Sequence, residues 1–363
     1  MGGAVVSRIP INTVRIQNLP SNTNRSSLLE SLGCPQDTVL SLEVSPNDFT
    51  KMTATVTVKD TREVERLLKL DNTSLGGSSR AASRVSVDTQ FHGFTVVAGG
   101  TNSELDIISI HGLNGHAFNS WATRDLMWLR DLLPERVPNA RVLLYGYNAN
   151  VLEDCFYGPD QRACQTLPSV PESLGGNRKG DCSFVNSSCF FGGLVLKQAL
   201  IFIKDQSEFS ALQDVALGVV FLATPHRGSK HADDMSGILV NMAKISFDAR
   251  AKRLLRTIQK DSNELMDMAL SFRDLHTELQ FASFCEQLPM KVSGMDLGLL
   301  VDQWSATLEV AHAPVIPVNR DHVTIAKIDG PGDGVLNLLV SELTRMITHA
   351  EEHGILEPQV NLQ

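Results

Sequence analysis

The sequence predicts an α/β protein in which a doubly wound, mostly parallel sheet follows a small α+β unit. Two observations lead to this prediction. From Asp106 onward, short and fully apolar strands alternate with longer helical stretches, which is typical of a parallel sheet covered on both faces. Before residue 98, strand-like and helix-like segments alternate on a shorter period. Because 363 residues are enough for two domains, we expect one at 12–98 and another at 104–350.

The composition argues against nucleic acid, metal and membrane roles. The formal net charge is −9, whereas nucleic-acid-binding proteins usually carry a basic face. The six cysteines form no Cys-x-x-Cys pair and have no histidine at metal-ligand spacing, so we expect reduced thiols, an intracellular compartment and no metal or cofactor. The longest apolar run, 215–223, is too short for a membrane span. We therefore expect a soluble protein, most simply a cytoplasmic one.

The first unit has a βαββαβ pattern, with strands at 14–19, 39–44 and 53–58, one or two further strands at 85–97, and helices at 25–32 and 62–70. This order resembles the ferredoxin-like plaits, and residues 16–20 resemble the first strand motif of an RNA-recognition module. Such a module stacks bases on aromatic side chains, but the equivalent positions here hold Arg15, Thr53 and Thr55. We therefore expect no RNA binding, and instead a structural role or a protein partner bound through residues 12–98. A Ser- and Gly-rich loop at 71–84 follows the second helix.

One segment of the second unit has the pattern of a nucleophile elbow without its nucleophile. In a Gly-x-Ser-x-Gly elbow, the serine lies on a sharp turn between a strand and a helix. Phe190 stands at that position in the run Ser188-Cys189-Phe190-Phe191-Gly192-Gly193. The helix that should follow is intact at 193–200. The pattern therefore predicts the turn but not the serine.

Other motifs lie at separate points of the second unit, in the order expected of a fold that contains a nucleophile elbow. Residues 108–116 read as a strand running into a His-Gly-Leu turn, and we expect the backbone N–H groups of Leu113 and Phe191 to form an oxyanion hole. A buried strand at 218–223 leads into Thr-Pro-His-Arg-Gly-Ser. A strand ending at Val318 is followed by His322. Helices are expected at 121–133 and at 334–349.

Together these motifs resemble the lipase-like α/β-hydrolases of the serine-active-site-containing protein family, of the type common in fungi. The resemblance covers 104–350, and Thr-Pro-His-Arg-Gly-Ser at 224–229 is its most specific element. It implies an α/β-hydrolase fold and the hydrolysis of carboxylic or phospholipid acyl esters. It also points to lipid metabolism in mitochondria or the endoplasmic reticulum.

By the same resemblance, a serine on the elbow, an acid after the next-to-last strand and a histidine before the last helix form a triad. His322 takes the last role, because Asp321-His322 is followed by Lys327 as in the family. Glu286, after the strand-like stretch 279–284, is favoured as the acid, and Asp302 is the alternative. Histidine suits this role because it exchanges protons near neutral pH, and the carboxylate fixes its tautomer.

Three interpretations of the elbow stay open. In the first, the chain is a pseudoenzyme that acts as an interaction or signalling module. In the second, Ser188 is the nucleophile after a shift of two residues, although Phe190 and Phe191 are bulky for the turn. In the third, the Pro- and Gly-rich stretch 166–189 is damaged, as by a misread exon, because it lies where the fold requires a helix and a buried strand.

Several candidate residues also have a purely structural interpretation. His226 and Arg227 brace the loop after their strand, and His111 and His116 orient the turn after theirs. Cys189 and Cys285 serve as small buried apolar groups.

Overall fold

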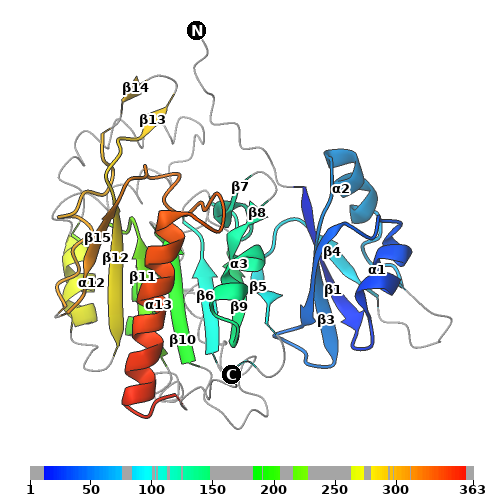
Figure 1. The fold of residues 1–363 in the computed structure, drawn as a ribbon, viewed down its shortest axis with the longest axis horizontal. Coiled ribbons are helices and arrows are strands. Elements are labelled where there is room, and N and C mark those ends of the chain that lie inside the picture. Colours follow the sequence, from blue (N-terminus) through cyan, green and yellow to red (C-terminus); the bar gives the residue numbers. More distant parts are fainter. Residues whose placement is uncertain are drawn as a thin grey trace.

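The chain forms a four-stranded sheet and a seven-stranded sheet, which Figure 1 shows side by side. The structure is a computed structural model. It describes residues 12–75, 84–99, 103, 105–112, 115–123, 126–147, 183–189, 191–204, 216–227, 263–273, 279–292, 295–296, 298–310 and 312–356.

The smaller sheet is antiparallel and has the strand order β2-β3-β1-β4. Its strands and helices are β1 (Thr13–Pro20), α1 (Arg25–Leu32), β2 (Val39–Val44), β3 (Lys51–Thr57), α2 (Thr61–Leu68) and β4 (Ser86–Asp88). Each helix begins at a polar cap, because Asn24 accepts a hydrogen bond from the Ser27 amide and Asp60 accepts one from the Arg62 amide. Apolar side chains of β1 and β3 pack with those of both helices in one core.

The larger sheet has the strand order β15-β12-β11-β10-β6-β9-β5. Six strands run parallel, and only β5 runs antiparallel to its neighbour, β9. The bounds are β5 (Gly93–Ala98), β6 (Leu105–Ile110), β9 (Ala140–Gly146), β10 (Ser183–Cys189), β11 (Ala216–Leu222), β12 (Gln280–Glu286) and β15 (Val315–Val318). Every residue of β6 and β9 is buried, as expected for strands with both faces covered. The predicted mostly parallel sheet is thus confirmed.

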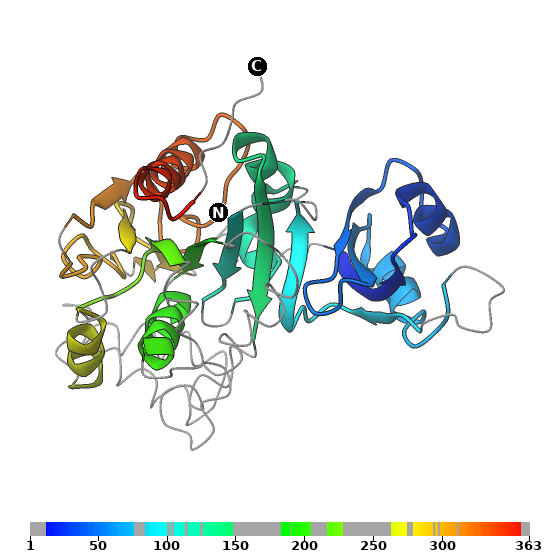
Figure 2. The same cartoon turned by 90° about the horizontal axis from the view of Figure 1, so that it is seen from below.

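Helices cover both faces of the larger sheet (Figure 2). On one face lie α8 (Phe191–Lys204) and α12 (Asn263–Arg273), and on the other lie α3 (Trp128–Asp131) and α13 (Gly334–Glu352). The helix α13 begins at Asp333, whose carboxylate accepts a hydrogen bond from the Val335 amide at 2.9 Å. The sheet is therefore doubly wound, as predicted.

The stretch expected as one or two strands at 85–97 forms two strands, which belong to different sheets. The stretch 85–97 contributes to both sheets, because β4 pairs with β1 whereas β5 pairs with β9. Phe91 (φ 56°) and Gly93 (φ 76°) both adopt left-handed backbone conformations where the chain passes from one sheet to the other. The change of sheet therefore falls between Asp88 and Gly93.

The prediction of one helix at 121–133 is wrong. Residues 119–123 and 126–136 form a series of short elements: η1 (Asn119–Trp121), β7 (Ala122–Thr123), β8 (Leu126–Met127), α3 and α4 (Leu133–Arg136). Strands β7 and β8 pair with each other, and the Thr123 hydroxyl donates to the Ile328 carbonyl at 3.3 Å. The Asp131 carboxylate accepts a hydrogen bond from the Met127 amide at 2.8 Å, so the helical turn begins only after Met127. A further small hairpin joins β13 (Lys291–Val292) and β14 (Met295–Asp296).

The face of the small sheet that lies opposite α1 and α2 is polar but buried. It carries Arg15, Thr53 and Thr55, the positions considered above for base stacking, and none is more than 4% exposed. The Arg15 guanidinium donates to Thr95 of β5 at 2.9 Å, and Arg130 donates to Thr57 at 3.0 Å. The chain itself therefore covers the positions that a base-stacking module would use.

Candidate active site

The candidate residues gather where the parallel strands end. Parallel strands bring their carboxyl ends to one edge of the sheet, where open α/β sheets bind their ligands. His111 follows β6, position 190 follows β10, and Thr224 follows β11. Glu286 ends β12, and His322 lies in the loop after β15. The topology thus assembles residues that lie far apart in the sequence.

The frame of the elbow is present. Strand β10 ends at Cys189 and helix α8 begins at Phe191, so position 190 alone joins them. A Cβ atom on Gly192 would lie 2.6 Å from the His111 carbonyl oxygen, and one on Gly193 would lie 2.3 Å from the Thr224 hydroxyl. Only glycine fits such close approaches. These two glycines allow the start of α8 to pack between the ends of β6 and β11.

The structure places Ser188 inside strand β10, where its backbone is in register with Ile110 of β6 and Phe221 of β11. The junction with the helix falls two residues later, at the position of Phe190. Phe190 itself and the side chains of Ser188, Cys189 and Phe191 lie outside the described part, as do residues 166–182. Residues 183–189 form the strand that the fold requires.

The structure brings His322 and Glu286 together. The His322 Nδ1 atom lies 3.4 Å from Oε2 of Glu286. The Glu286 side chain is fully buried, and its Oε1 accepts a hydrogen bond from the Val301 amide. The His322 side chain is 10% exposed. A buried carboxylate beside Nδ1 of a partly accessible imidazole is the arrangement that orients a general base.

Asp302, the alternative acid, has a local role. Its carboxylate accepts a hydrogen bond from the Ser305 amide at 2.7 Å, and its carbonyl accepts one from Ala306 at 2.9 Å. Such a side chain stabilises a turn of its own segment. The geometry therefore favours Glu286 as the partner of His322.

Three contacts hold the His322 loop against the segment that was expected to be one helix. Lys327 donates through Nζ to the Ala122 carbonyl at 3.0 Å, and the Trp128 indole donates to the Ala326 carbonyl at 3.0 Å. The third is the bond from Thr123 to Ile328 described above. Lys327, which the sequence singled out with His322, thus fixes the loop that carries this histidine.

His111 supports the turn after β6. Its Nε2 accepts the Tyr147 amide at 3.3 Å, so its proton resides on Nδ1, which donates to the Gly112 carbonyl at 3.0 Å. The Tyr147 hydroxyl donates to the His111 carbonyl at 2.8 Å, and the two rings stack. Burial lowers the pKa of His111 to about 4, so the ring is neutral at pH 7. Leu113, the proposed oxyanion donor, lies outside the described part.

His116 and His226 are also held by their surroundings. His116 bonds through Nε2 to the Thr89 carbonyl at 2.6 Å, and its Nδ1 accepts the Phe118 amide at 3.1 Å. His226 bonds through Nε2 to the Ser283 hydroxyl at 3.3 Å, and burial holds its pKa well below the usual range. Arg227 forms an ion pair with Glu309 at 3.1 Å. These contacts favour the structural interpretation of the three residues.

The sequence analysis missed Lys197, which is fully buried in α8. Its Nζ lies 5.0 Å from the centre of the Phe272 ring and has no hydrogen-bond partner among the described residues. Burial lowers its pKa to about 7. A lone lysine in the apolar run 194–203 was the available signal.

The remaining expectations concern thiols, metals and membranes. Cys285 is buried, and burial raises the pKa of its thiol to about 11, which makes it unreactive. Within the described ranges, no cluster of histidine, cysteine and acidic residues suits a metal ion. No helix in those ranges is both long enough and apolar enough to cross a membrane.

Two solved lipase structures are similar to part of this chain. A lipase from Bacillus licheniformis, BlEst2 in its mature form, is similar over 70% of this chain and 97% of its own, with 15% identity and a TM-score of 0.43. Lipase 1 from Pelosinus fermentans is similar over 67% of this chain and 99% of its own, with 10% identity and a TM-score of 0.42.

The similar curated proteins carry one name. Protein SERAC1 of Homo sapiens is 25% identical over 245 residues, which are 62% of this chain and 36% of the human protein. Protein SERAC1 of Danio rerio is 25% identical over 248 residues. The chain spans about a third of the length of these relatives. No family model matches the chain.

Proposed function

We propose that this chain is an acyl-ester hydrolase of the lipase and esterase class. One observation carries the proposal: His322 lies 3.4 Å from the buried carboxylate of Glu286, at the edge of the sheet where β10 meets α8. A buried acid beside Nδ1 holds the ring of a general-base histidine in the required tautomer and orientation.

In the proposed mechanism, Glu286 holds the Nδ1 side of His322 and leaves Nε2 to exchange a proton with the nucleophile and the leaving group. With the nucleophile at Ser188, the backbone N–H groups of Leu113 and of Cys189, the residue after the nucleophile, stabilise the oxyanion that develops in the transition state. Phe191, the donor expected from the sequence, takes this role only with a nucleophile at position 190. The substrates are carboxylic or phospholipid acyl esters.

The nucleophile is the hydroxyl of Ser188, because phenylalanine at position 190 has no group that can attack an ester. This assignment requires the junction between β10 and α8 to shift by two residues. The alternative function is binding of acyl esters without hydrolysis. It is supported by the position of Ser188 within strand β10, in register with Ile110 and Phe221, because a serine there is not on the turn before the helix.

Labelling with a fluorophosphonate probe separates the two functions. The purified full chain is compared with Ser188→Ala and His322→Ala, and Ser187→Ala serves as the matched control from the same strand. We expect labelling of the wild-type chain and of Ser187→Ala, and its loss in the other two variants. The absence of labelling from a folded wild-type chain would overturn the hydrolase and leave the binding protein.

We also propose the family and the domain organisation. The similarity to Protein SERAC1 over 62% of the chain supports membership of the serine-active-site-containing protein family. The strand order β2-β3-β1-β4 supports a ferredoxin-like first domain, which then covers residues 12–88. The hydrolase-like domain covers 93–350, since β5 belongs to its sheet.

A further inference from the structure

Arg320 connects the two members of the candidate pair through its backbone. It lies two residues before His322, in the loop between β15 and α13. Its carbonyl oxygen accepts hydrogen bonds from the amides of Gln287 at 3.2 Å and Leu288 at 3.1 Å, which directly follow Glu286. The segment that carries the base is thus tied to the end of the strand that carries the acid.

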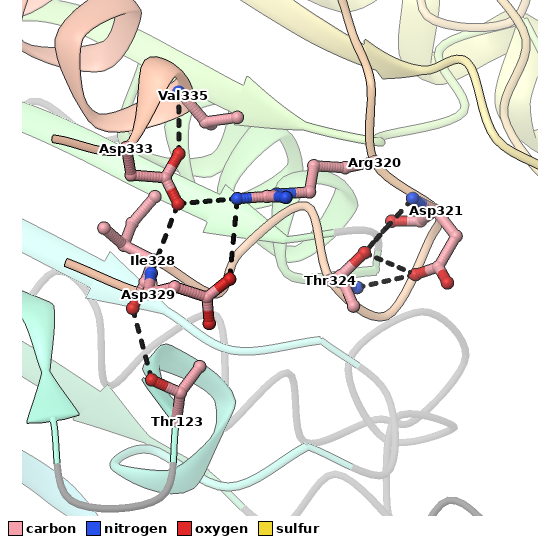
Figure 3. A network of polar contacts seen from close by, with 8 residues as sticks. All are labelled: Thr123, Arg320, Asp321, Thr324, Ile328, Asp329, Asp333 and Val335. Atoms are coloured by element: carbon pink, nitrogen blue, oxygen red, sulfur yellow. Dashed lines mark hydrogen bonds and ion pairs between the residues drawn. The ribbon is translucent and has the colours of Figure 1, made fainter. Parts of the chain in front are cut away.

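The Arg320 side chain ties the same segment to helix α13 (Figure 3). Its guanidinium lies 2.6 Å from Oδ2 of Asp333 and 3.7 Å from Asp329. The other Asp333 oxygen accepts the Val335 amide at 2.9 Å and caps the helix. The Asp333 side chain is 4% exposed and the Arg320 side chain 28% exposed, so this charge-assisted bond is partly shielded from solvent.

The chain after His322 is fixed by a second, separate contact. One carboxylate oxygen of Asp321 accepts hydrogen bonds from the Thr324 amide at 2.8 Å and the Thr324 hydroxyl at 2.7 Å (Figure 3). The same oxygen accepts the Val323 amide at 3.0 Å. These bonds close a turn around His322. The imidazole is therefore carried by a short rigid segment, and Arg320 holds the first end of that segment.

We propose that Arg320 and Asp333 are positioning residues that set the distance between His322 and Glu286. The inference rests on the proposed function, which assigns that pair its role. Loss of the Arg320–Asp333 bond frees one anchor of the loop, so the imidazole moves relative to a carboxylate that stays buried. A displacement of about 1 Å in a catalytic group can lower a rate by about 10²-fold.

The competing interpretation is that the Arg320–Asp333 bond only secures the start of α13. Asp333→Asn separates the two, because asparagine caps a helix as well as aspartate does but lacks the charge that pairs with Arg320. Arg345→Met is the matched control. Arg345 also joins α13 to β12, through Gln280 at 2.6 Å, but it does so at the other end of the strand.

The test measures the imidazole directly in the full chain. Histidine is labelled with ¹⁵N, the His322 Nδ1–H resonance is assigned by its disappearance in His322→Gln, and its exchange rate with water is measured. We expect exchange to accelerate by about tenfold or more in Arg320→Met and Asp333→Asn, as expected for loss of a charged hydrogen bond. Arg320→Lys retains an ion pair with Asp333 and should fall in between.

Exchange in Arg345→Met should match the wild type even where its thermal stability falls as far as that of Arg320→Met. Equal exchange in Arg320→Met, Asp333→Asn and Arg345→Met would overturn the proposal. The exchange measurement requires no turnover. Failure of fluorophosphonate labelling would therefore reject the proposed function, whereas the exchange rates would still decide the positioning role. If the protein does hydrolyse esters, the two variants should lower kcat and leave KM unchanged, which a purely stabilising contact would not do.

Discussion

Two buried cations of this protein have opposite surroundings. Arg15, at the junction of the two sheets, is 4% exposed and donates to Asp88, to the His92 carbonyl and to Thr95, each at 2.9 Å. Lys197, in the helix that begins at the elbow, is fully buried and has no hydrogen-bond partner in the part of the chain that the structure describes. Burying a charge is costly unless it is paired. We therefore expect removal of Arg15 to destabilise the protein and replacement of Lys197 by an apolar side chain to stabilise it.

The two surroundings indicate different roles for the junction between the sheets and for the region around the candidate site. At the junction between the sheets, the buried guanidinium of Arg15 has hydrogen-bond partners, as buried polar groups in structural contacts usually do. At the carboxyl edge of the large sheet, His322 lies beside the buried carboxylate of Glu286. Lys197 in helix α8 has a lowered pKa, and groups with perturbed pKa values are often found at functional sites. The predictions below test that contrast.

Removal of Arg15 should have the largest effect. We expect Arg15→Met to lower the free energy of unfolding by about 3 kcal/mol, because Asp88 and Thr95 lose their partner in a buried region. Urea denaturation measures this. Arg66→Met is the control, since the side chains of Arg66 and Glu63 are 40% and 43% exposed and Arg66 also donates to the Leu32 carbonyl, and it should cost less than Arg15→Met. Equal losses of stability in Arg15→Met and Arg66→Met would contradict the expected importance of the buried Arg15 contacts.

Replacement of Lys197 should have the opposite sign. We expect Lys197→Met to raise the free energy of unfolding by about 2 kcal/mol at pH 7, because an unpaired buried cation is replaced by an apolar side chain. Its pKa is lowered to about 7 in the folded chain, so between pH 7 and 10 the unfolded chain binds a proton that the folded chain does not. Wild-type stability should rise with pH by up to about 1.4 kcal/mol per unit in this window.

The pH slope should vanish in Lys197→Met, as measured by urea denaturation at pH 7, 8 and 9. A variant less stable than the wild type at every pH would mean that Lys197 has a stabilising partner.

A methyl group at the elbow should have a smaller effect. We expect Gly193→Ala to cost about 1 kcal/mol, because its Cβ would lie 2.3 Å from the Thr224 hydroxyl. Gly332→Ala is the control, since no atom lies within 4 Å of a Cβ at that position. Thermal unfolding of both variants measures the difference. Similar melting temperatures would show that α8 does not pack closely on the end of β11.

Replacement of Asp302 should have almost no effect. Asparagine can accept the same hydrogen bond from the Ser305 amide, so Asp302→Asn should change stability by less than about 0.5 kcal/mol. Fluorophosphonate labelling should be unchanged, whereas Glu286→Gln should abolish it. The reverse pattern would make Asp302 the acid.

The fold was largely predictable because apolar runs mark the buried strands. Strand β6 is buried at every position and was recognised as one such run. The sheet to which β5 belongs was not predictable, since an apolar strand pattern does not state its partner. The segment around Trp128 was also misassigned, because contacts to Ala326 and Ile328, far along the chain, override its helical pattern.

The candidate site was predictable only in part. His322 and Glu286 follow strands, and a parallel sheet brings such positions to one edge. The contribution of Arg320 could not be inferred, because its carbonyl bonds to residues 287 and 288 and its side chain bonds to Asp333 only in the folded chain. The burial of Lys197 likewise depends on α12, which supplies the Phe272 ring.

Hydrolysis of a short-chain p-nitrophenyl ester by the full chain tests the central claim most directly. The initial rate is compared between the wild type, His322→Ala and Glu286→Gln. The proposed pair predicts turnover by the wild type and a fall of about 10⁴-fold or more in both variants, as for the loss of a triad member. A wild-type rate equal to that of buffer, or an unchanged rate in His322→Ala, would contradict it.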